Sequence, residues 1–195
     1  MKTENIFYFI GSKTQFSCTI QCQQCQAETT SGKRCSNRTC IDKYCWIHLR
    51  KIKHLRIKKS LLLNAGRGLF ADDGTKSQDI VFKKNDRILS NITLYNGEKV
   101  TGKELDKRYG DDTAPYGIGM GSVYEDGACV CGAGTMANHS PKQANAKLSF
   151  DSKNKVFSVK ATKNIKNGQE IYVNYGRDYK FESNVKHFEK RRTKK

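Results

Sequence analysis

The sequence lacks any long run of apolar residues. None approaches the roughly 20 residues that a helix needs to cross a bilayer. The first apolar stretch, in "MKTENIFYFIGSK", has only five such residues, whereas a secretory signal requires a core of about 7–15. We therefore expect no membrane partner and no secretion, and we place the protein inside the cell, in the nucleus or the cytoplasm.

Acidic residues are also scarce, at 19 against 36 Lys and Arg, and the net charge is +17. Residues 1–60 and 141–195 are strongly basic, whereas residues 61–140 carry nine basic and eleven acidic side chains. Basic segments favour anionic partners, so we expect contact with DNA or nucleosomes through the two ends. Four acids of the middle region could attract a basic peptide tail, but a solvated loop is the favoured interpretation: Asp111, Asp112, Glu125 and Asp126.

The chain has no internal repeat and few helical patterns. Short apolar stretches such as "IVF", "ITLY", "KLSF" and "VFSVKA" lie between turn-forming residues and predict strands. "EIYVNY" predicts a further strand, because Ile171, Val173 and Tyr175 alternate along it. One helix is predicted to begin at Thr101, with Glu104 as its capping partner, and to stop at Gly110. We therefore expect a mostly β protein.

Six of the eight cysteines lie between Cys18 and Cys45. Inside a cell, thiols and metal ligands are favoured over disulfides. Thiolate and imidazole suit tetrahedral zinc, and the spacing of Cys45 and His48 lets a single turn direct both at one ion. A module this small has too little core to fold alone, so we expect a structural zinc site. Cys129 and Cys131 are interpreted as small buried hydrophobic residues.

Two ligand sets fit the cysteine spacing. The first is Cys25, Cys35, Cys45 and His48. The second uses Cys22 in place of Cys35, and Cys40 can replace a member of either set. The stretch "CQAETTSGKRCSNRTCIDKYCWIH" resembles a small zinc-binding motif of phage and large-DNA-virus proteins, and this resemblance favours the first set.

Four further strings follow one another along the chain: "NAGRGLFA", "YNGEKVTGKEL", "MANHS" and "GQEIYVNYG". In this order and at these separations they resemble the SET-domain protein lysine methyltransferases, over about residues 55–180. The resemblance implies a fold of short strands in small sheets, with a knot-like crossing of the carboxy-terminal strand. We add to it a small zinc-stabilised amino-terminal module. The resulting expected organisation is a Cys/His zinc-binding module at 1–50, a basic connector at 51–60, a SET domain at 61–176 and a basic tail at 177–195.

The same resemblance assigns roles to residues. Tyr175 corresponds to the catalytic tyrosine of the family. The residues expected to bind S-adenosyl-L-methionine are Gly66, Arg67, Gly68, Tyr116, Asn138 and His139. The two glycines would let the backbone approach the cofactor without interference from a Cβ atom. Tyr95 is expected in the core, and Tyr179 or Phe181 is expected to cover the cofactor.

The sequence departs from the family pattern at three places. Asn174 replaces the usual Asp before the catalytic tyrosine, and Pro141 replaces a cysteine that often follows "NHS". No cysteine follows Tyr175, so the zinc-binding segment found after the SET domain in many members is missing. The tail must therefore form any lid by aromatic packing.

The expected function is S-adenosylmethionine-dependent protein lysine N-methylation, acting on a basic protein tail such as a histone. The combination of motifs looks like proteins encoded by large DNA viruses. The alternative is a non-catalytic, zinc-containing chromatin or nucleic-acid binding protein with a SET-like domain. Retention of Asn138, His139 and Tyr175 argues against that alternative.

Overall fold

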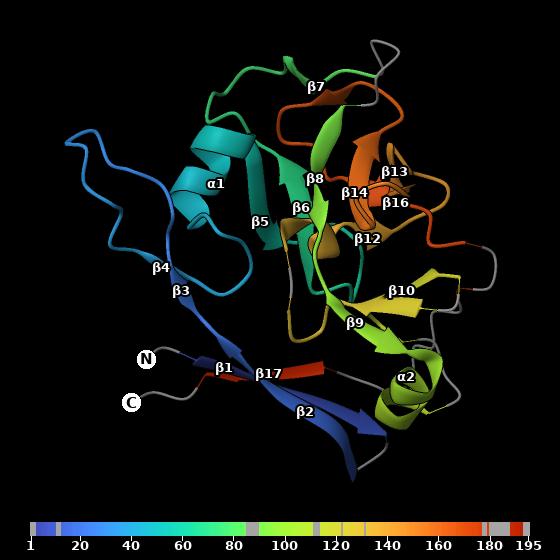
Figure 1. The fold of residues 1–195 in the computed structure, drawn as a ribbon. Helices are drawn as coiled ribbons and strands as arrows, with labels where there is room; N and C mark the ends of the chain where they lie inside the picture. Colours follow the sequence, from blue (N-terminus) through green and yellow to red (C-terminus); the bar gives the residue numbers. More distant parts are fainter. Residues whose placement is uncertain are drawn as a thin grey trace.

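The computed structural model describes residues 3–10, 13–84, 90–110, 114–121, 123–130, 132–176, 179 and 188–192. The strands form several small sheets rather than one continuous sheet, and the helices are short (Figure 1). This mostly β architecture confirms the expected fold class. None of the helices in these ranges has the length and apolar character that crossing a membrane demands.

Three segments that are distant in the sequence meet at the centre of the fold. β5 (Leu55–Lys59) pairs antiparallel with β6 (Arg67–Ala71), and the amide of Ile171 donates to the carbonyl of Leu69 over 2.7 Å. β12 (Asn138–His139) pairs in parallel with β16 (Tyr172–Val173). This parallel pair is the carboxy-terminal crossing that the sequence resemblance implied, and it brings the "NHS" and "EIYVNY" strings together.

The remaining strands of the body frame this centre in small sheets (Figure 1). β8 (Asn91–Tyr95), β13 (Ala146–Asp151) and β14 (Val156–Ala161) form one sheet, and β9 (Glu98–Thr101), β10 (Gly117–Met120) and β11 (Val123–Asp126) form another. Two pairs complete the set: β7 (Ile80–Phe82) with β15 (Ile165–Lys166), and β3 (Gln23–Gln24) with β4 (Arg38–Thr39).

The strand predicted over "EIYVNY" is shorter than expected, because only Tyr172 and Val173 are in β16. Backbone amides on both sides do not continue its ladder of backbone hydrogen bonds. The amide of Ile171 bonds to β6, and the amide of Tyr175 donates to the imidazole of His139. The segment therefore joins two neighbours instead of extending one strand.

The predicted helix is confirmed as α2 (Gly102–Tyr109). Its N-cap residue Thr101 accepts a hydrogen bond from the amide of Glu104 over 3.2 Å, and Gly110 ends the helix at φ 72°. A second helix, α1 (Trp46–Lys53), precedes β5, and a short 3-10 helix, η1 (Ala133–Met136), leads directly towards β12.

One apolar core lies beneath these central segments. Its buried side chains come from α1, β5, β6, β8, η1 and β13 to β16, and include Leu49, Leu55, Leu69, Val159 and Val173. Burial of a large aliphatic side chain contributes about 1.5–3 kcal/mol. The packing of this core therefore fixes the positions of the strands that meet at the centre.

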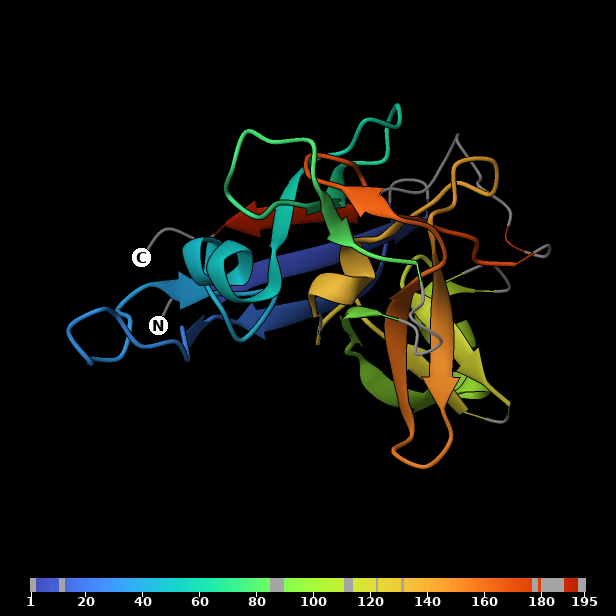
Figure 2. The same ribbon diagram turned by 90° about the horizontal axis from the view of Figure 1, so that it is seen from above.

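A separate sheet joins the two ends of the described chain. β1 (Thr3–Ile10) lies between β2 (Lys13–Gln21) and β17 (Phe188–Arg192), with both pairs antiparallel (Figures 1 and 2). α2 packs on β2 through an edge-to-face contact between Phe16 and Tyr109, whose ring centroids are 5.8 Å apart. The basic tail expected from residue 177 onward thus includes a strand.

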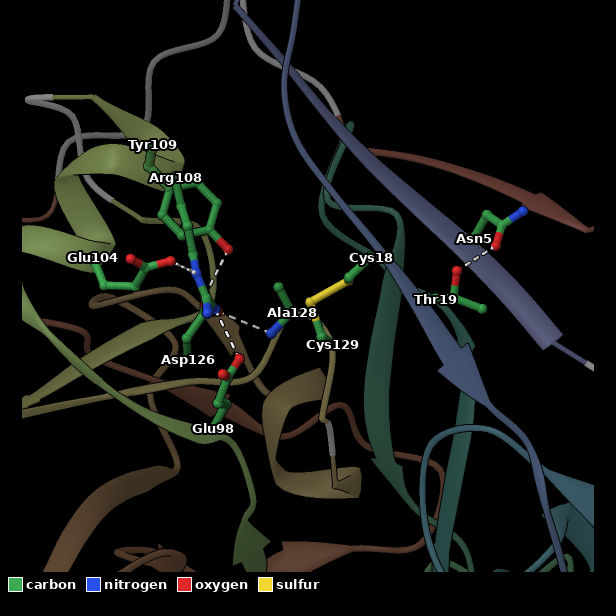
Figure 3. Close-up of a disulfide and its surroundings, with 10 residues drawn as sticks. All are labelled: Asn5, Cys18, Thr19, Glu98, Glu104, Arg108, Tyr109, Asp126, Ala128 and Cys129. Atoms are coloured by element: carbon green, nitrogen blue, oxygen red, sulfur yellow. Dashed lines mark hydrogen bonds and ion pairs between the residues drawn. A yellow bond between two sulfur atoms is a disulfide. The ribbon is translucent and has the colours of Figure 1, made fainter.

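Two disulfides correct the expectation that the cysteines are thiols and metal ligands. Cys18 of β2 is bonded to Cys129, with Cα atoms 6.0 Å apart (Figure 3), and Cys22 is bonded to Cys40. Cys129 is therefore not an isolated buried hydrophobe; the packing of β2 on the body brings it to Cys18 across 111 residues. Cys131 lies outside the described residues.

Two of the acids expected in a solvated loop are buried instead. Asp126 is fully buried and accepts hydrogen bonds from the Arg108 guanidinium at 2.9 Å and from the Tyr109 hydroxyl at 2.8 Å (Figure 3). Glu125 is 6% exposed. The carboxylate of Asp126 stabilises the contact between α2 and β11, because its buried charge is paired. Asp111 and Asp112 lie outside the described residues.

We predict that the Cys18–Cys129 bond stabilises the attachment of the terminal sheet. The double variant Cys18→Ser with Cys129→Ser should lose about 2–4 kcal/mol of unfolding free energy, because the bond restricts the unfolded chain over a long loop. Urea unfolding of oxidised protein measures this loss. The prediction would be contradicted by free thiols at both positions in non-reducing peptide mapping of the wild type. An unchanged unfolding free energy in the double variant would also contradict it.

Candidate functional site

The buried carboxylate of Glu170 joins the central segments. Its Oε1 accepts hydrogen bonds from Ser60 Oγ at 2.6 Å and from Asn138 Nδ2 at 3.1 Å. Its Oε2 accepts from the amide of Leu61 at 2.7 Å and from the hydroxyl of Tyr172 at 2.8 Å. With 3% of its surface exposed, this carboxylate needs such partners, because an unpaired buried charge is strongly destabilising.

The two glycines of "GRG" have different structural roles. A Cβ atom at Gly68 would lie 2.1 Å from Glu170 Oε1 and 3.2 Å from Asn138 Nδ2, so glycine is required for the carboxylate to reach this strand. Gly66 has φ +67°, and a Cβ atom there would meet nothing within 4 Å. Gly66 therefore borders open space, whereas Gly68 faces the buried network.

Asn138 connects this network to the backbone of Arg67. Its side-chain Nδ2 donates to the carbonyl oxygen of Arg67 over 3.0 Å and to Glu170 Oε1. The side chain of Asn138 is half-buried. The "GRG" and "NHS" strings, 71 residues apart at this contact, thus meet through one carboxamide.

His139 and Tyr175 lie next to each other. His139 Nδ1 accepts a hydrogen bond from the backbone amide of Tyr175 at 3.0 Å, which leaves the ring proton of the neutral imidazole on Nε2. Burial lowers the pKa of His139 below its ordinary value, so the neutral form is favoured. The imidazole is therefore available as a donor at Nε2.

The hydroxyl of Tyr175 donates to the carbonyl oxygen of Ala137 over 2.7 Å. Burial, with smaller contributions from Tyr179 and Tyr116, raises the pKa of Tyr175 above its ordinary value. The phenol therefore remains protonated at physiological pH. Although its proton is donated to Ala137, its oxygen can still accept a hydrogen bond from an incoming N–H group.

The ring of Tyr175 lies beside the rings of His139 and Tyr179. Tyr179 lies 4.8 Å from Tyr175 in an edge-to-face arrangement and 4.9 Å from His139, measured between ring centroids. The hydroxyl of Tyr95 donates to the backbone carbonyl of Tyr116, and Tyr95 is buried as expected. Phe181, the other residue expected as a cover, lies outside the described residues.

The site thus brings together the segments that carry every residue predicted to bind the cofactor or act in catalysis. Gly66, Arg67 and Gly68 adjoin Asn138, and His139 adjoins Tyr175. Tyr116 packs against the same core and contributes to the raised pKa of Tyr175. The described residues of this site supply hydrogen-bond donors and acceptors beside aromatic rings, and none of them is a strong base.

The sequence interpretation missed Glu170, Ser60 and Tyr172. Glu170 stands inside the quoted string "GQEIYVNYG", where it is the only charged residue of an apolar stretch. That isolation was a usable signal, since charged residues are almost never fully buried without partners. No comparable signal marks Ser60, because its partner lies 110 residues away.

The first of the two metal-ligand sets is brought together near the start of α1. One ligand atom from each of Cys25, Cys35, Cys45 and His48 lies within 4.8 Å of the others. His48 Nδ1 is 3.3 Å from Cys45 Sγ and 3.6 Å from Cys25 Sγ. A tetrahedral zinc ion would place its ligands roughly 3.3–3.8 Å apart, so this donor set fits zinc. The alternative set is wrong, because Cys22 and Cys40 are bonded to each other.

Neighbouring groups favour a thiolate at Cys45. Burial raises the pKa of Cys45, but hydrogen bonds from His48 and from the Asn37 side chain outweigh it and lower the pKa to about 6. At Cys35 the backbone of Asn37 lowers the pKa, whereas burial and the adjacent thiols of Cys45 and Cys25 outweigh it and leave the pKa raised. A thiolate at Cys45 beside the thiol of Cys35 is a suitable starting state for a cation, which replaces the remaining thiol proton.

Comparison with solved structures supports the fold. A chain in the structure of ctPRC2 in complex with H3K27me3 and H3K27M superposes with a TM-score of 0.54 at 21% identity, covering 66% of this chain and 15% of that chain. A chain of the Chaetomium thermophilum polycomb repressive complex 2 gives a TM-score of 0.48 at 24% identity, covering 67% of this chain and 16% of that chain. This protein therefore spans a small part of those chains. The first likeness, at 21% identity, bears on the fold alone.

Comparison with protein families is more direct. No curated protein sequence matches the chain, but the family model described as "SET domain" matches residues 66–176. The match begins at the glycine that borders open space and ends just after Tyr175, so it includes Asn138, Glu170 and Tyr175, whereas Ser60 and Tyr179 lie outside it. It spans more than half of the 195 residues, and the chain belongs to the SET domain family.

Proposed function

We propose that this protein is an S-adenosylmethionine-dependent protein lysine N-methyltransferase. Membership of the SET domain family indicates lysine methyltransferase activity. The observation that carries the proposal is the meeting of the "GRG", "NHS" and "NYG" segments around one half-buried site. A SET-like domain that serves only as a binding module would not need a phenol, an imidazole and a carboxamide held in this relation.

The chain's own groups fit the cofactor. The position beside Gly66 is open, and the ring of Tyr179 lies against the imidazole of His139. The tautomer makes His139 Nε2 a donor, and no acceptor for it is found among the described residues. These groups suit a ligand with an aromatic base and a zwitterionic amino-acid end. When bound, S-adenosylmethionine would supply a methyl group: an uncharged amine would form the N–C bond as the C–S bond breaks, the neutral thioether would leave, and the methylated ammonium would release its proton to water.

Tyr175 would orient the substrate amine. A free lysine has a pKa of about 10.4 and is charged at neutral pH, but burial between aromatic rings disfavours the ammonium form. The Tyr175 oxygen, whose proton is directed at Ala137, accepts one N–H of the amine and aligns its lone pair. Orientation and desolvation then lower the barrier without a general base.

The proposed substrate is a basic protein tail such as a histone. The related complex described above was solved with H3K27me3 and H3K27M, which supports a histone tail as the first substrate to test. The basic residues of both ends would hold the enzyme near DNA or a nucleosome. A nuclear or cytoplasmic location inside the cell follows from this proposal. An origin in a large DNA virus rests on the sequence strings alone.

We also propose that Cys25, Cys35, Cys45 and His48 hold a structural zinc ion. These four groups would complete the coordination shell and leave no position for a substrate. The proposed domain organisation follows from it: a zinc-binding module at 1–50, a connector at 51–60, the SET domain at 61–176 and a basic tail at 177–195.

Replacement of the phenol tests the proposed function directly. Tyr175→Phe should lower methyl transfer to histones by about 100-fold or more, because one preorganised hydrogen-bond partner of the reacting group is lost. Transfer of labelled methyl from S-adenosylmethionine to a panel of histones, with mass spectrometry to locate it, measures this. Tyr124→Phe is the matched control, because it removes the same hydroxyl from a tyrosine of β11 whose ring lies beside Gly102 at the start of α2. Equal transfer by both variants would refute the role, and no transfer by the wild type would favour the non-catalytic alternative.

Removal of a metal ligand tests the zinc proposal. Cys45→Ala should lose the bound zinc, and the melting temperature should fall, because metal binding is coupled to folding of the small module. Elemental analysis of the purified protein gives the stoichiometry, which should be close to one for wild type. Cys18→Ala should keep its zinc. Stoichiometric zinc in Cys45→Ala, or a zinc-free wild type from zinc-supplemented culture, would contradict the assignment.

We predict that the imidazole of His139 makes the stability of the protein depend on pH. Because its pKa is lowered in the folded state, the unfolded chain binds the proton more tightly, and stability rises with pH between the folded and unfolded values. Above the ordinary histidine pKa of about 6.5, protonation of His139 should not reduce the unfolding free energy. As the pH falls below that value, the unfolded chain takes up the proton first, and the unfolding free energy should decrease. The melting temperature from pH 7.5 to 5 measures this. His139→Gln should show a shallower slope; equal slopes would contradict the assignment.

A further inference from the structure

The orientation of the Asn138 carboxamide is fixed by two acceptors. Its Nδ2 donates to the Arg67 carbonyl and to Glu170 Oε1, at 3.0 and 3.1 Å. A carbonyl oxygen and a carboxylate oxygen accept hydrogen bonds but do not donate them. A flipped amide would therefore place oxygen against oxygen at both contacts. Both amide protons are used, and Oδ1 accepts no hydrogen bond from the described residues.

The position of Glu170 is itself fixed by independent donors. Ser60 Oγ accepts from the amide of Leu62 at 3.1 Å, so its own proton is available for Glu170 Oε1. The amide of Leu61 and the hydroxyl of Tyr172 hold Oε2. Gly68 leaves the space that Oε1 occupies. The carboxylate therefore reaches Asn138 as a rigid acceptor.

We propose that Glu170 is a positioning residue that holds Asn138 with its carboxamide oxygen directed at the ligand, so that this position selects a hydrogen-bond donor. The inference rests on the proposed function, in which the ligand has an amino-acid end. At Asn138 the site would then take the ammonium group of S-adenosylmethionine rather than its carboxylate. Glu170 itself does not touch the ligand; it acts through Asn138.

Glu170→Gln separates this role from a merely structural one. The amide of Leu61 can only donate, so the oxygen of the introduced carboxamide should settle beside Leu61 and Tyr172. The amino group of that carboxamide would then face Asn138 Nδ2, donor against donor. The Asn138 carboxamide should lose its single orientation, and with it the preference for an ammonium group.

The experiment compares two ligands by calorimetry on the 195-residue protein, purified in the presence of zinc: S-adenosylmethionine, and its analogue in which hydrogen replaces the α-ammonium group. The wild type should bind S-adenosylmethionine about 10- to 100-fold more tightly, as for a hydrogen bond to a charged group. In Glu170→Gln this ratio should fall to within about threefold of one. A ratio that stays at the wild-type value in folded Glu170→Gln overturns the proposal.

Two control variants make the result specific. Ser60→Ala removes one donor to Glu170 but leaves its contact with Asn138, so it should lower the melting temperature and keep the wild-type ratio. Glu28→Gln changes an exposed carboxyl group and should change neither quantity. If Glu170→Gln does not fold, Glu170→Asp replaces it, because the shorter carboxylate withdraws from Asn138 and should also reduce the ratio. A ratio reduced equally in Ser60→Ala would overturn the positioning role.

A measurement without ligand keeps this inference distinct from the proposed function. The side-chain amide signals of Asn138 in a ¹⁵N spectrum are identified by their loss in Asn138→Asp. They should exchange with solvent at least about tenfold faster in Glu170→Gln than in the wild type, because one acceptor is lost. Unchanged exchange overturns the positioning of Asn138. A wild type that binds no S-adenosylmethionine would instead refute the proposed function, while this readout still decides the role of Glu170.

Discussion

The site depends on one buried carboxylate. Glu170 accepts hydrogen bonds from four groups that belong to three separate parts of the chain. An isolated charge at this depth would be strongly unfavourable, so the segments around it must stay together for the carboxylate to remain paired. The same carboxylate requires glycine at position 68 and accepts a hydrogen bond from the carboxamide of Asn138. One buried group therefore stabilises the central segments and also holds a side chain of the site.

The groups around this carboxylate have complementary roles. Tyr175 directs its proton at a backbone carbonyl and keeps its oxygen free to accept. His139 accepts a backbone amide at one ring nitrogen and keeps a donor at the other. Asn138 donates both amide protons to acceptors within the protein, and its oxygen accepts no hydrogen bond from the described residues. Each side chain thus has one end held by the fold and one end available, which is what a preorganised site requires.

Much of this could be predicted from the sequence, because the relevant signals are local or lie in ordered strings. The helix of Thr101 to Gly110 carries its own capping residues, and the four strings indicate the fold and the convergence of Asn138 with Arg67. The disulfide of Cys18 with Cys129 could not be predicted, since the two residues are 111 positions apart. The burial of Asp126 depends on Arg108 from another element, and composition alone cannot reveal such pairing.

The central claim is that three remote segments form one binding site for S-adenosylmethionine. Amide hydrogen exchange measured with and without that ligand tests it most directly. The account predicts that the ligand slows exchange together in residues 66–71, 136–140 and 168–176. Protection confined to one of these segments, or no change in any of them, would contradict it.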